Sequence, residues 1–116
     1  DSQPRFEYRL LATSKTSTLQ KEMQEAGDAG FEYRGQTVFN TTFGGDEPVV
    51  ILERSRDSAN RDLFEYRLLA TKQTSTMQDE LREAGLAGFN FVGVTISSTT
   101  FGGDEIVAIL KRAVTE

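Results

Sequence analysis

The chain has 116 residues, of which 37% are apolar and 27% are charged, a composition typical of one globular domain with a hydrophobic core of its own. It contains no cysteine and no histidine, which excludes disulfides, thiolate metal sites and nucleophiles activated by histidine. The formal net charge of −5 argues against a nucleic-acid partner, because such partners are bound by basic surfaces.

Targeting signals are not evident either. No run of apolar residues is long enough for a membrane span, so no membrane partner is expected. The first residues lack the basic start and apolar centre of a signal peptide, although Asp1 to Pro4 would also suit the start of a processed chain. The compartment therefore stays open between the cytoplasm and a processed secreted or periplasmic location.

The sequence contains one unit twice. Residues 6–54 align without a gap on residues 64–112, at an offset of 58, and about two-thirds of the paired positions are identical. A polar connector, residues 55–63, joins the repeats. One unit is too small to be secure alone, so the sequence predicts a single domain over residues 1–116.

The first element of each repeat is predicted to be a strand. Phe6, Tyr8, Leu10 and Ala12 alternate with more polar residues, the period of a strand that buries one face. The same octapeptide returns at residues 64–71, with the same expected buried face.

A short amphipathic helix is predicted next. Ser17 with Gln20, and Ser75 with Gln78, have the spacing of a capping box, and apolar residues follow at helical spacing. One glycine of a pair should end each helix, because glycine accepts the left-handed conformation after a helix. These pairs are Gly27 with Gly30 and Gly85 with Gly88.

Two further strands complete each repeat. The first is long, with either a bulge or a close backbone approach expected at Gly35 and at Gly93. Paired glycines at 44–45 and 102–103 suit a tight hairpin. The closing strand, residues 49–52 or 107–110, is apolar throughout, which favours a central place in its sheet.

Together these elements predict an α+β fold of tandem βαββ repeats. Six mainly antiparallel strands should form, with two helices packed on the sheet. Two copies of one unit are expected to pair about a pseudo-twofold axis, as in a dimer fused into one chain.

The residues that follow the helix, Glu25-Ala26-Gly27-Asp28-Ala29-Gly30-Phe31-Glu32-Tyr33, and the closing Leu52-Glu53-Arg54 carry a resemblance. Each unit resembles the small uncharacterised bacterial domains known as domain of unknown function 4177. The resemblance implies a fold and a tendency to self-associate, and it implies no catalytic activity.

Acidic pairs follow the hairpin glycines. Asp46-Glu47 and Asp104-Glu105 could offer oxygen ligands to calcium or magnesium, but they lack the spaced ligands of an EF-hand loop. A solvated hairpin tip is the favoured interpretation. We therefore predict no metal site and no cofactor.

Two sets of residues are candidates for ligand binding. Tyr8-Arg9 and Tyr66-Arg67 could present a phenol and a guanidinium to an anion, although neighbours on a strand point to opposite faces. The alternative is that the tyrosine packs in the core while the arginine pairs with an acid across the sheet. Thr41 and Thr99 could line a polar pocket, or could simply reflect the preference of threonine for strands.

The repeats differ most along the long strand, where Val92 and Val94 replace Arg34 and Gln36. Val92 and Val94 are therefore candidates for an interface, for example in a homo-oligomer. The sequence favours a non-enzymatic binding or assembly module. The alternative is a small-molecule-binding protein or a cofactor-independent enzyme with a pocket between sheet and helices. A polar cavity containing an arginine would favour the alternative, and an apolar sheet face would favour assembly.

Overall fold

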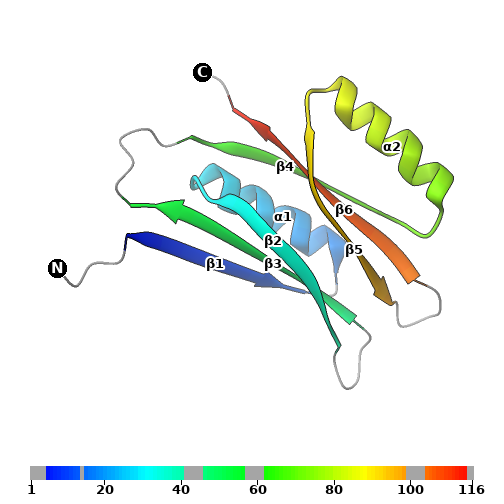
Figure 1. The fold of residues 1–116 in the computed structure, drawn as a ribbon, viewed down its shortest axis with the longest axis horizontal. Coiled ribbons are helices and arrows are strands. Elements are labelled where there is room, and N and C mark those ends of the chain that lie inside the picture. The colour runs from blue at the N-terminus through cyan, green and yellow to red at the C-terminus, as the bar shows by residue number, and fades with distance from the viewer. Residues whose placement is uncertain (1–4, 14, 41–45, 57–61, 99–103, 115–116) are drawn as a thin grey trace.

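The computed structural model describes residues 5–13, 15–40, 46–56, 62–98 and 104–114, and both repeats have the same order of elements (Figure 1). Unit one consists of β1 (Phe6–Ala12), α1 (Thr16–Asp28), β2 (Glu32–Asn40) and β3 (Asp46–Ser55). Unit two consists of β4 (Phe64–Thr71), α2 (Thr74–Leu86), β5 (Asn90–Ser98) and β6 (Asp104–Ala113). The predicted glycine hairpins lie outside the described residues.

Each unit forms its own antiparallel sheet of three strands. The strand orders are β1-β3-β2 and β4-β6-β5, so the closing strand of each unit is central. The apolar character of β3 and β6 follows from this place, because a central strand is flanked on both sides. The expected α+β fold, with six antiparallel strands and two helices packed against them, is confirmed.

The helix ends show where local sequence signals work and where they fail. Gly30 and Gly88 have φ angles of +88° and +93°. The N–H of Phe31 bonds the carbonyl of Ala26 at 2.9 Å, which is the expected left-handed helix end. The predicted capping boxes are wrong, because α1 begins at Thr16 without a side-chain cap and Ser17 lies inside the helix.

The long strands bulge where they were expected to. The pairing of β2 with β3 shifts between Tyr33 and Gly35, and that of β5 with β6 shifts between Phe91 and Gly93. One extra residue in each strand re-aims the side chains that follow. The bulge in β5 brings Gly93 against unit one, as described below.

The hydrophobic core has two parts. The larger part combines α1 and the inner face of the first sheet with one face of the second sheet, and it contains Leu19, Leu52, Tyr66 and Ile109. The smaller part lies between α2 and the other face of the second sheet, around Met77 and Leu110. The second sheet is thus covered on both faces, whereas the first is covered on one.

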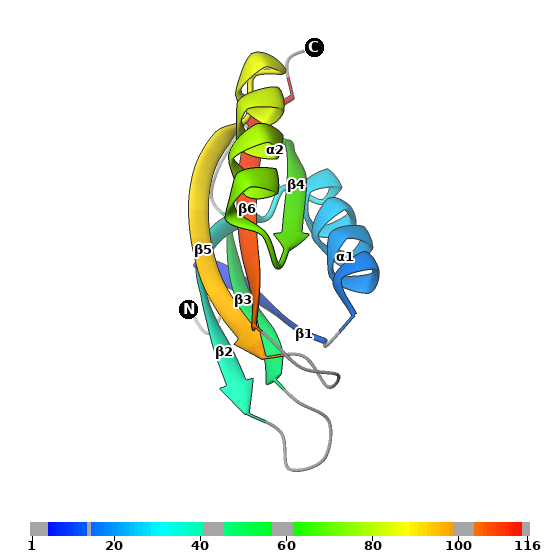
Figure 2. The same cartoon turned by 90° about the vertical axis from the view of Figure 1, so that its right-hand side faces the viewer.

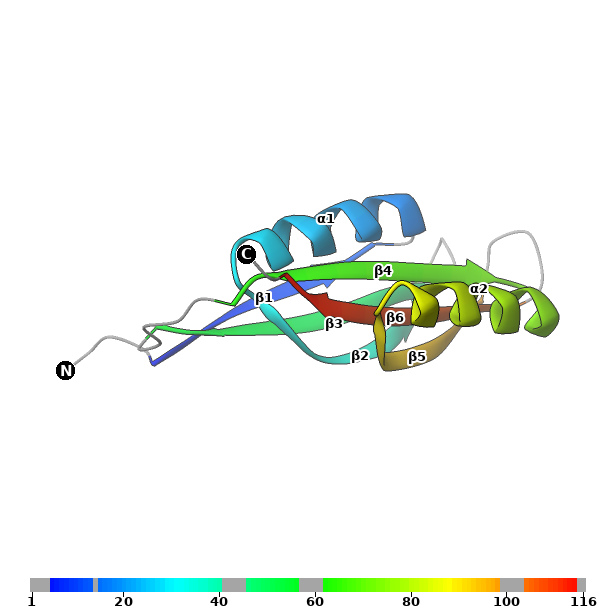
Figure 3. The same cartoon turned by 90° about the horizontal axis from the view of Figure 1, so that it is seen from above.

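The arrangement of layers follows from this core. Helix α1 lies against β4 of the other unit, while α2 lies at the end of the molecule beyond β6 (Figures 2 and 3). The radius of gyration is 15.2 Å, above the roughly 13 Å usual for a domain of 100 residues. The two units therefore form a broad, flattened body with a large surface.

The expectation for β1 is wrong in unit one. Tyr8 is 64% exposed and Leu10 63%, whereas Tyr66, the equivalent of Tyr8, is 3% exposed. The reason is that α1 packs on the opposite face of the first sheet, where Leu11 is buried. Equivalent residues of the two units thus have different surroundings, unlike the equal contacts that a pseudo-twofold axis would give.

Candidate functional site

Contacts between the units are made by different elements on the two sides. We call this contact the junction: unit one contributes α1, β2 and β3, and unit two contributes the face and edge formed by β4, β6 and β5. A contact between two different surfaces is heterologous, and it leaves one copy of each surface unused. The contacts within the junction define what those unused surfaces could bind.

A glutamine of α1 closes the edge of β4. The side-chain amide of Gln20 donates to the carbonyl of Tyr66 at 2.8 Å and its oxygen accepts from the N–H of Leu68 at 2.7 Å. Gln24 accepts from the N–H of Tyr66 at 3.3 Å. The strand edge, which otherwise presents unpaired backbone groups, is satisfied by helix side chains. Sequence analysis missed Gln20 as a contact residue because its spacing fitted a helix cap.

A buried tyrosine links β4 to β2. The hydroxyl of Tyr66 accepts from the N–H of Tyr33 at 2.7 Å and donates to the carbonyl of Phe31 at 3.0 Å. Burial raises the pKa of Tyr66 well above its ordinary value, and it also raises the pKa of Tyr33. The phenol is thereby held neutral, which suits a packing role rather than proton transfer.

Two glycines allow the units to approach closely. A Cβ at Gly27 would meet the backbone carbonyl of Phe64, and a Cβ at Gly93 would meet the hydroxyl of Tyr33. One glycine comes from each side of the junction. A side chain at Gly27 would push against backbone and separate the two surfaces, whereas a side chain at Gly93 would require the ends of the Tyr33 and Gln36 side chains to move.

One ion pair crosses the junction at its edge. The Lys111 ammonium lies 2.5 Å from the Glu32 carboxylate, and both side chains are partly buried. This pair fixes β2 of unit one relative to β6 of unit two. Because water reaches this ion pair, it contributes little to the free energy of folding, and its main effect is on how the two strands are oriented.

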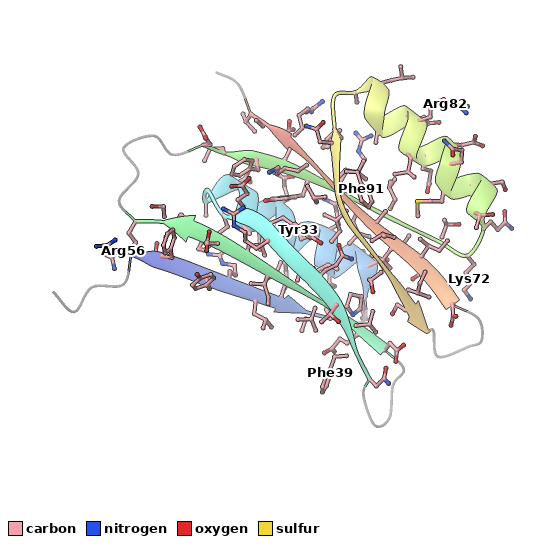
Figure 4. The ribbon with its side chains drawn as sticks, viewed as in Figure 1. Tyr33, Phe39, Arg56, Lys72, Arg82 and Phe91 are labelled. Atoms are coloured by element: carbon pink, nitrogen blue, oxygen red, sulfur yellow. The ribbon has the colours of Figure 1, made fainter. Side chains whose placement is uncertain are left out.

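The face of unit one that faces away from the junction exposes large apolar side chains, and the ion pair of Arg34 with Glu53 lies beside Tyr8 on the same face. We call it the outer face of unit one; its large exposed side chains are Phe6, Tyr8, Leu10, Phe39 and Ile51. Phe39 projects from the end of β2, away from the rest of the molecule (Figure 4). The five equivalent residues of unit two are buried or half-buried: Phe64, Tyr66, Leu68, Ser97 and Ile109.

Unit two has a corresponding open face beside α2. Phe91, Val94 and Ile96 are each about half exposed, and Phe91 lies at the surface of β5 (Figure 4). Their equivalents in unit one are Tyr33, Gln36 and Val38, which are buried or half-buried. We call this surface, together with the outward side of α2, the open face of unit two.

The predicted tyrosines and arginines are not brought together into one pocket. Tyr8 and Tyr66 point to one face of their strands, while the Arg9 guanidinium lies 4.4 Å from the ring centre of Phe31 on the other face. Arg67 stacks in the same way on Phe89, also at 4.4 Å. Cation–π stacking of this kind stabilises the side-chain positions. Thr41 and Thr99 lie outside the described residues.

Arginines and acids pair elsewhere on the sheets. Arg54 bonds Glu7 at 2.6 Å and Arg34 bonds Glu53 at 2.9 Å. The hydrogen bond from Arg34 lowers the pKa of Glu53, and the hydrogen bond to Glu53 raises the pKa of Tyr8. These are solvent-accessible pairs that orient surface side chains.

The predicted interface pair divides between two environments. Val92 is half-buried and packs against the larger core, so it belongs to the junction. Val94 is 50% exposed and belongs to the open face of unit two. The bulge at Gly93 separates them.

A cavity of about 280 Å³ lies between the helices and β4. Among the described residues, its lining includes no arginine and none of the predicted tyrosines, and one carboxylate oxygen of Glu80 in its wall has no hydrogen-bond partner. Its lining residues are Thr16, Ser17, Gln20, Leu68, Leu69, Ala70 and Glu80.

Within the described residues, no group of three or more acidic side chains could hold a metal ion. No described helix is long and apolar enough to cross a membrane. Comparison with protein-family models, with curated proteins and with solved structures gives no match for this chain.

Proposed function

We propose that the protein is a non-enzymatic assembly module that binds another protein through the outer face of unit one. One observation carries this proposal: the same face of unit two is buried by a helix and a strand of unit one. Tyr66 is 3% exposed where Tyr8 is 64% exposed. A surface of this shape and composition is therefore able to bind a protein partner, since it does so within the chain.

The chemistry of the outer face supports this role. Its phenylalanine, tyrosine, leucine and isoleucine side chains form an exposed apolar surface, a feature that often marks a protein-binding site. Tyr8 adds a hydroxyl, and tyrosine is enriched at the centre of protein interfaces because it combines apolar area with a polar group. The edge strand β1 adds backbone donors and acceptors.

The alternative, a small-molecule-binding protein or a cofactor-independent enzyme, has less support. No described arginine lines the cavity beside Glu80, and the guanidinium groups of Arg9 and Arg67 are stacked on phenylalanine rings. Membership of domain of unknown function 4177 stays a proposal based on the motif after each helix, and its implied self-association agrees with an assembly role.

Site-specific photo-crosslinking tests the proposed function. A photoreactive amino acid replaces Leu10 in the full chain, which is expressed in its native cells, and crosslinked peptides are identified by mass spectrometry. We expect crosslinks from position 10 to one defined protein surface, either of another protein or of a second copy. The matched control carries the same group at Lys21, an exposed residue of α1. Equal and unspecific labelling from both positions would contradict a binding role for the outer face.

A further inference from the structure

Resting on that proposed function, we infer that the partner is a second copy of this chain, which docks its open face of unit two on the outer face of unit one. The two surfaces are the counterparts of those already joined at the junction. Because the junction is heterologous, repeating it between chains uses exactly the surfaces it leaves free, and it produces a head-to-tail assembly.

The contacts that close the edge of β4 can be repeated between chains. Gln78 is the equivalent of Gln20, and it stands on the exposed side of α2. Its amide would donate to the carbonyl of Tyr8 and accept from the N–H of Leu10 in the neighbouring copy. Both partner atoms are backbone atoms, so the bonds do not depend on further side chains.

The tyrosine link can also be repeated. The hydroxyl of Tyr8 would accept from the N–H of Phe91 and donate to the carbonyl of Phe89, as Tyr66 does with Tyr33 and Phe31. Again, both partner groups are backbone groups. In the single chain Tyr8 bonds Glu53 at the surface, so docking exchanges an exposed bond for two buried ones.

Gly85 is the equivalent of Gly27, and its environment supports the inference. A Cβ at Gly85 would meet no atom of the described residues within 4 Å, so none of them occupies the space beside it. In a docked copy Gly85 would lie against the carbonyl of Phe6, as Gly27 lies against that of Phe64. Docking therefore needs glycine at this helical position, although folding does not.

At two positions the free surfaces are more apolar than the buried surfaces they match, whereas Arg34 on the outer face of unit one is the counterpart of the half-buried Val92. Phe39 stands exposed where Ser97 is buried. Val94 is apolar and half exposed, whereas its equivalent Gln36 is polar and less exposed. Surfaces that met only water would gain nothing from these apolar side chains. Burial of the same side chains between chains would stabilise the assembly in proportion to the apolar area removed from water.

Some contacts are lost in the repeated junction. Asn90 and Glu53 stand at the positions equivalent to Glu32 and Lys111, so the contact between chains has no ion pair there. Arg82 stands at the position of Gln24, so the N–H of Tyr8 would have no side-chain acceptor like the one that Gln24 offers Tyr66. Arg82 projects outward from α2 (Figure 4). The contact between chains is therefore weaker than the junction, and the assembly should form and dissociate with concentration.

Sedimentation velocity across a concentration series tests the inference with the intact chain. We expect multiples of 12.9 kDa at high concentration. Gly85→Ala should lower the association constant at least tenfold without loss of folding stability. Tyr8→Lys should lower it as strongly from the other side of the contact. Leu86→Asp is the matched control, because Leu86 is 84% exposed and unit one carries an aspartate at that position.

Mixing the two variants distinguishes a head-to-tail contact from a symmetric one. The Gly85→Ala chain keeps its outer face, and the Tyr8→Lys chain keeps its open face, so together they have one intact contact. We expect a heterodimer that grows no larger. A lack of complementation, or self-association that survives both substitutions, would overturn the inference.

The proposed function and the inference can fail separately. A wild-type chain that stays monomeric at every concentration overturns the second-copy inference. Crosslinks from position 10 to another protein would then still support the binding role of the outer face. Unspecific crosslinks from position 10, together with a chain that stays monomeric, would contradict both the binding role and the second-copy inference.

Discussion

Tyr66 accepts a hydrogen bond from the backbone of Tyr33 at 2.7 Å, and this bond joins two sheets that come from different repeats. The same hydroxyl donates to the carbonyl of Phe31, so a single side chain satisfies two buried backbone groups. Tyr8, at the same position of an identical octapeptide, is at the surface. The same substitution made at Tyr8 and at Tyr66 therefore distinguishes the contribution of the residue type to stability from the contribution of its surroundings.

Tyr66→Phe should lower the free energy of unfolding by about 1–3 kcal/mol, because the buried N–H of Tyr33 loses its acceptor. Tyr8→Phe should change it by less than about 0.5 kcal/mol, as surface substitutions usually do. Urea unfolding at low protein concentration measures both. Equal effects of the two substitutions would contradict the unequal burial of the tyrosines.

Alkaline pH should destabilise the fold through the same residue. Burial raises the pKa of Tyr66 above the ordinary value of 10.0, so the folded chain holds this proton more tightly than the unfolded chain. The stabilisation is complete below pH 10, and it is lost as the pH rises from 10 toward the folded pKa. Unfolding free energies measured on both sides of pH 10 should show this decline.

The control for the pH effect is again Tyr66→Phe. It should have a shallower decline above pH 10, with a remainder from Tyr33, whose pKa is also raised by burial. An unchanged decline in the variant would show that other groups cause the alkaline loss.

The two helical glycines should respond in opposite directions. Gly27→Ala places a Cβ against the carbonyl of Phe64, and we expect a loss of about 1–3 kcal/mol from the forced backbone shift. Gly85→Ala has open space and should gain about 0.5–1 kcal/mol from the better helix propensity of alanine. Thermal unfolding at low concentration compares them, and destabilisation by Gly85→Ala would contradict the open environment.

Charged substitutions should separate the two valines. Val92→Asp should destabilise the fold by about 1–3 kcal/mol, because Val92 packs against the larger core and a charge there loses water. Val94→Asp should leave the unfolding free energy within about 0.5 kcal/mol and act on self-association instead. Urea unfolding combined with sedimentation distinguishes the two effects.

Self-association should become tighter when the free surfaces are made like the buried ones. The substitutions are Arg34→Val, Glu53→Lys, Arg82→Gln and Asn90→Glu, each taken from the equivalent position of the junction. They restore the ion pair and the glutamine contact between chains, and we expect at least a tenfold increase of the association constant. Asn90→Lys alone places a lysine opposite the unchanged Glu53 of the neighbouring copy, and it tests whether one ion pair between chains is sufficient to raise the association constant. An association constant unaffected by all four changes would contradict the head-to-tail geometry.

Much of the fold could be predicted from local sequence. The order of elements, the central place of β3 and β6, the bulges at Gly35 and Gly93, and the helix ends at Gly30 and Gly88 depend on nearby residues. Each follows from a backbone preference or a hydrophobic period. These signals are the same in both repeats, and both repeats fold alike.

The candidate site could not be predicted in the same way. Phe-Glu-Tyr-Arg-Leu-Leu-Ala-Thr opens both repeats, yet its tyrosine is buried only in the second copy, because α1 packs on the opposite face of the first copy, where Leu11 is buried. No pattern within an identical peptide can encode two environments. Gln20 is a second example, because capping-box spacing and contact with a distant strand use the same residue. Both outcomes depend on how the units pack, which is a property of the whole chain.

The shared core has a consequence for synthesis. Leu19 and Met23 of α1 belong to the same cluster as Phe64 and Ile109 of unit two. When the N-terminal half leaves the ribosome, the helix side that will cover β4 has no covering strand until the second half follows. The nascent chain therefore passes through a stage in which an apolar helix surface is open to solvent or to a chaperone. Truncation after the first repeat would fix the chain at that stage, and the second repeat completes the fold of the first.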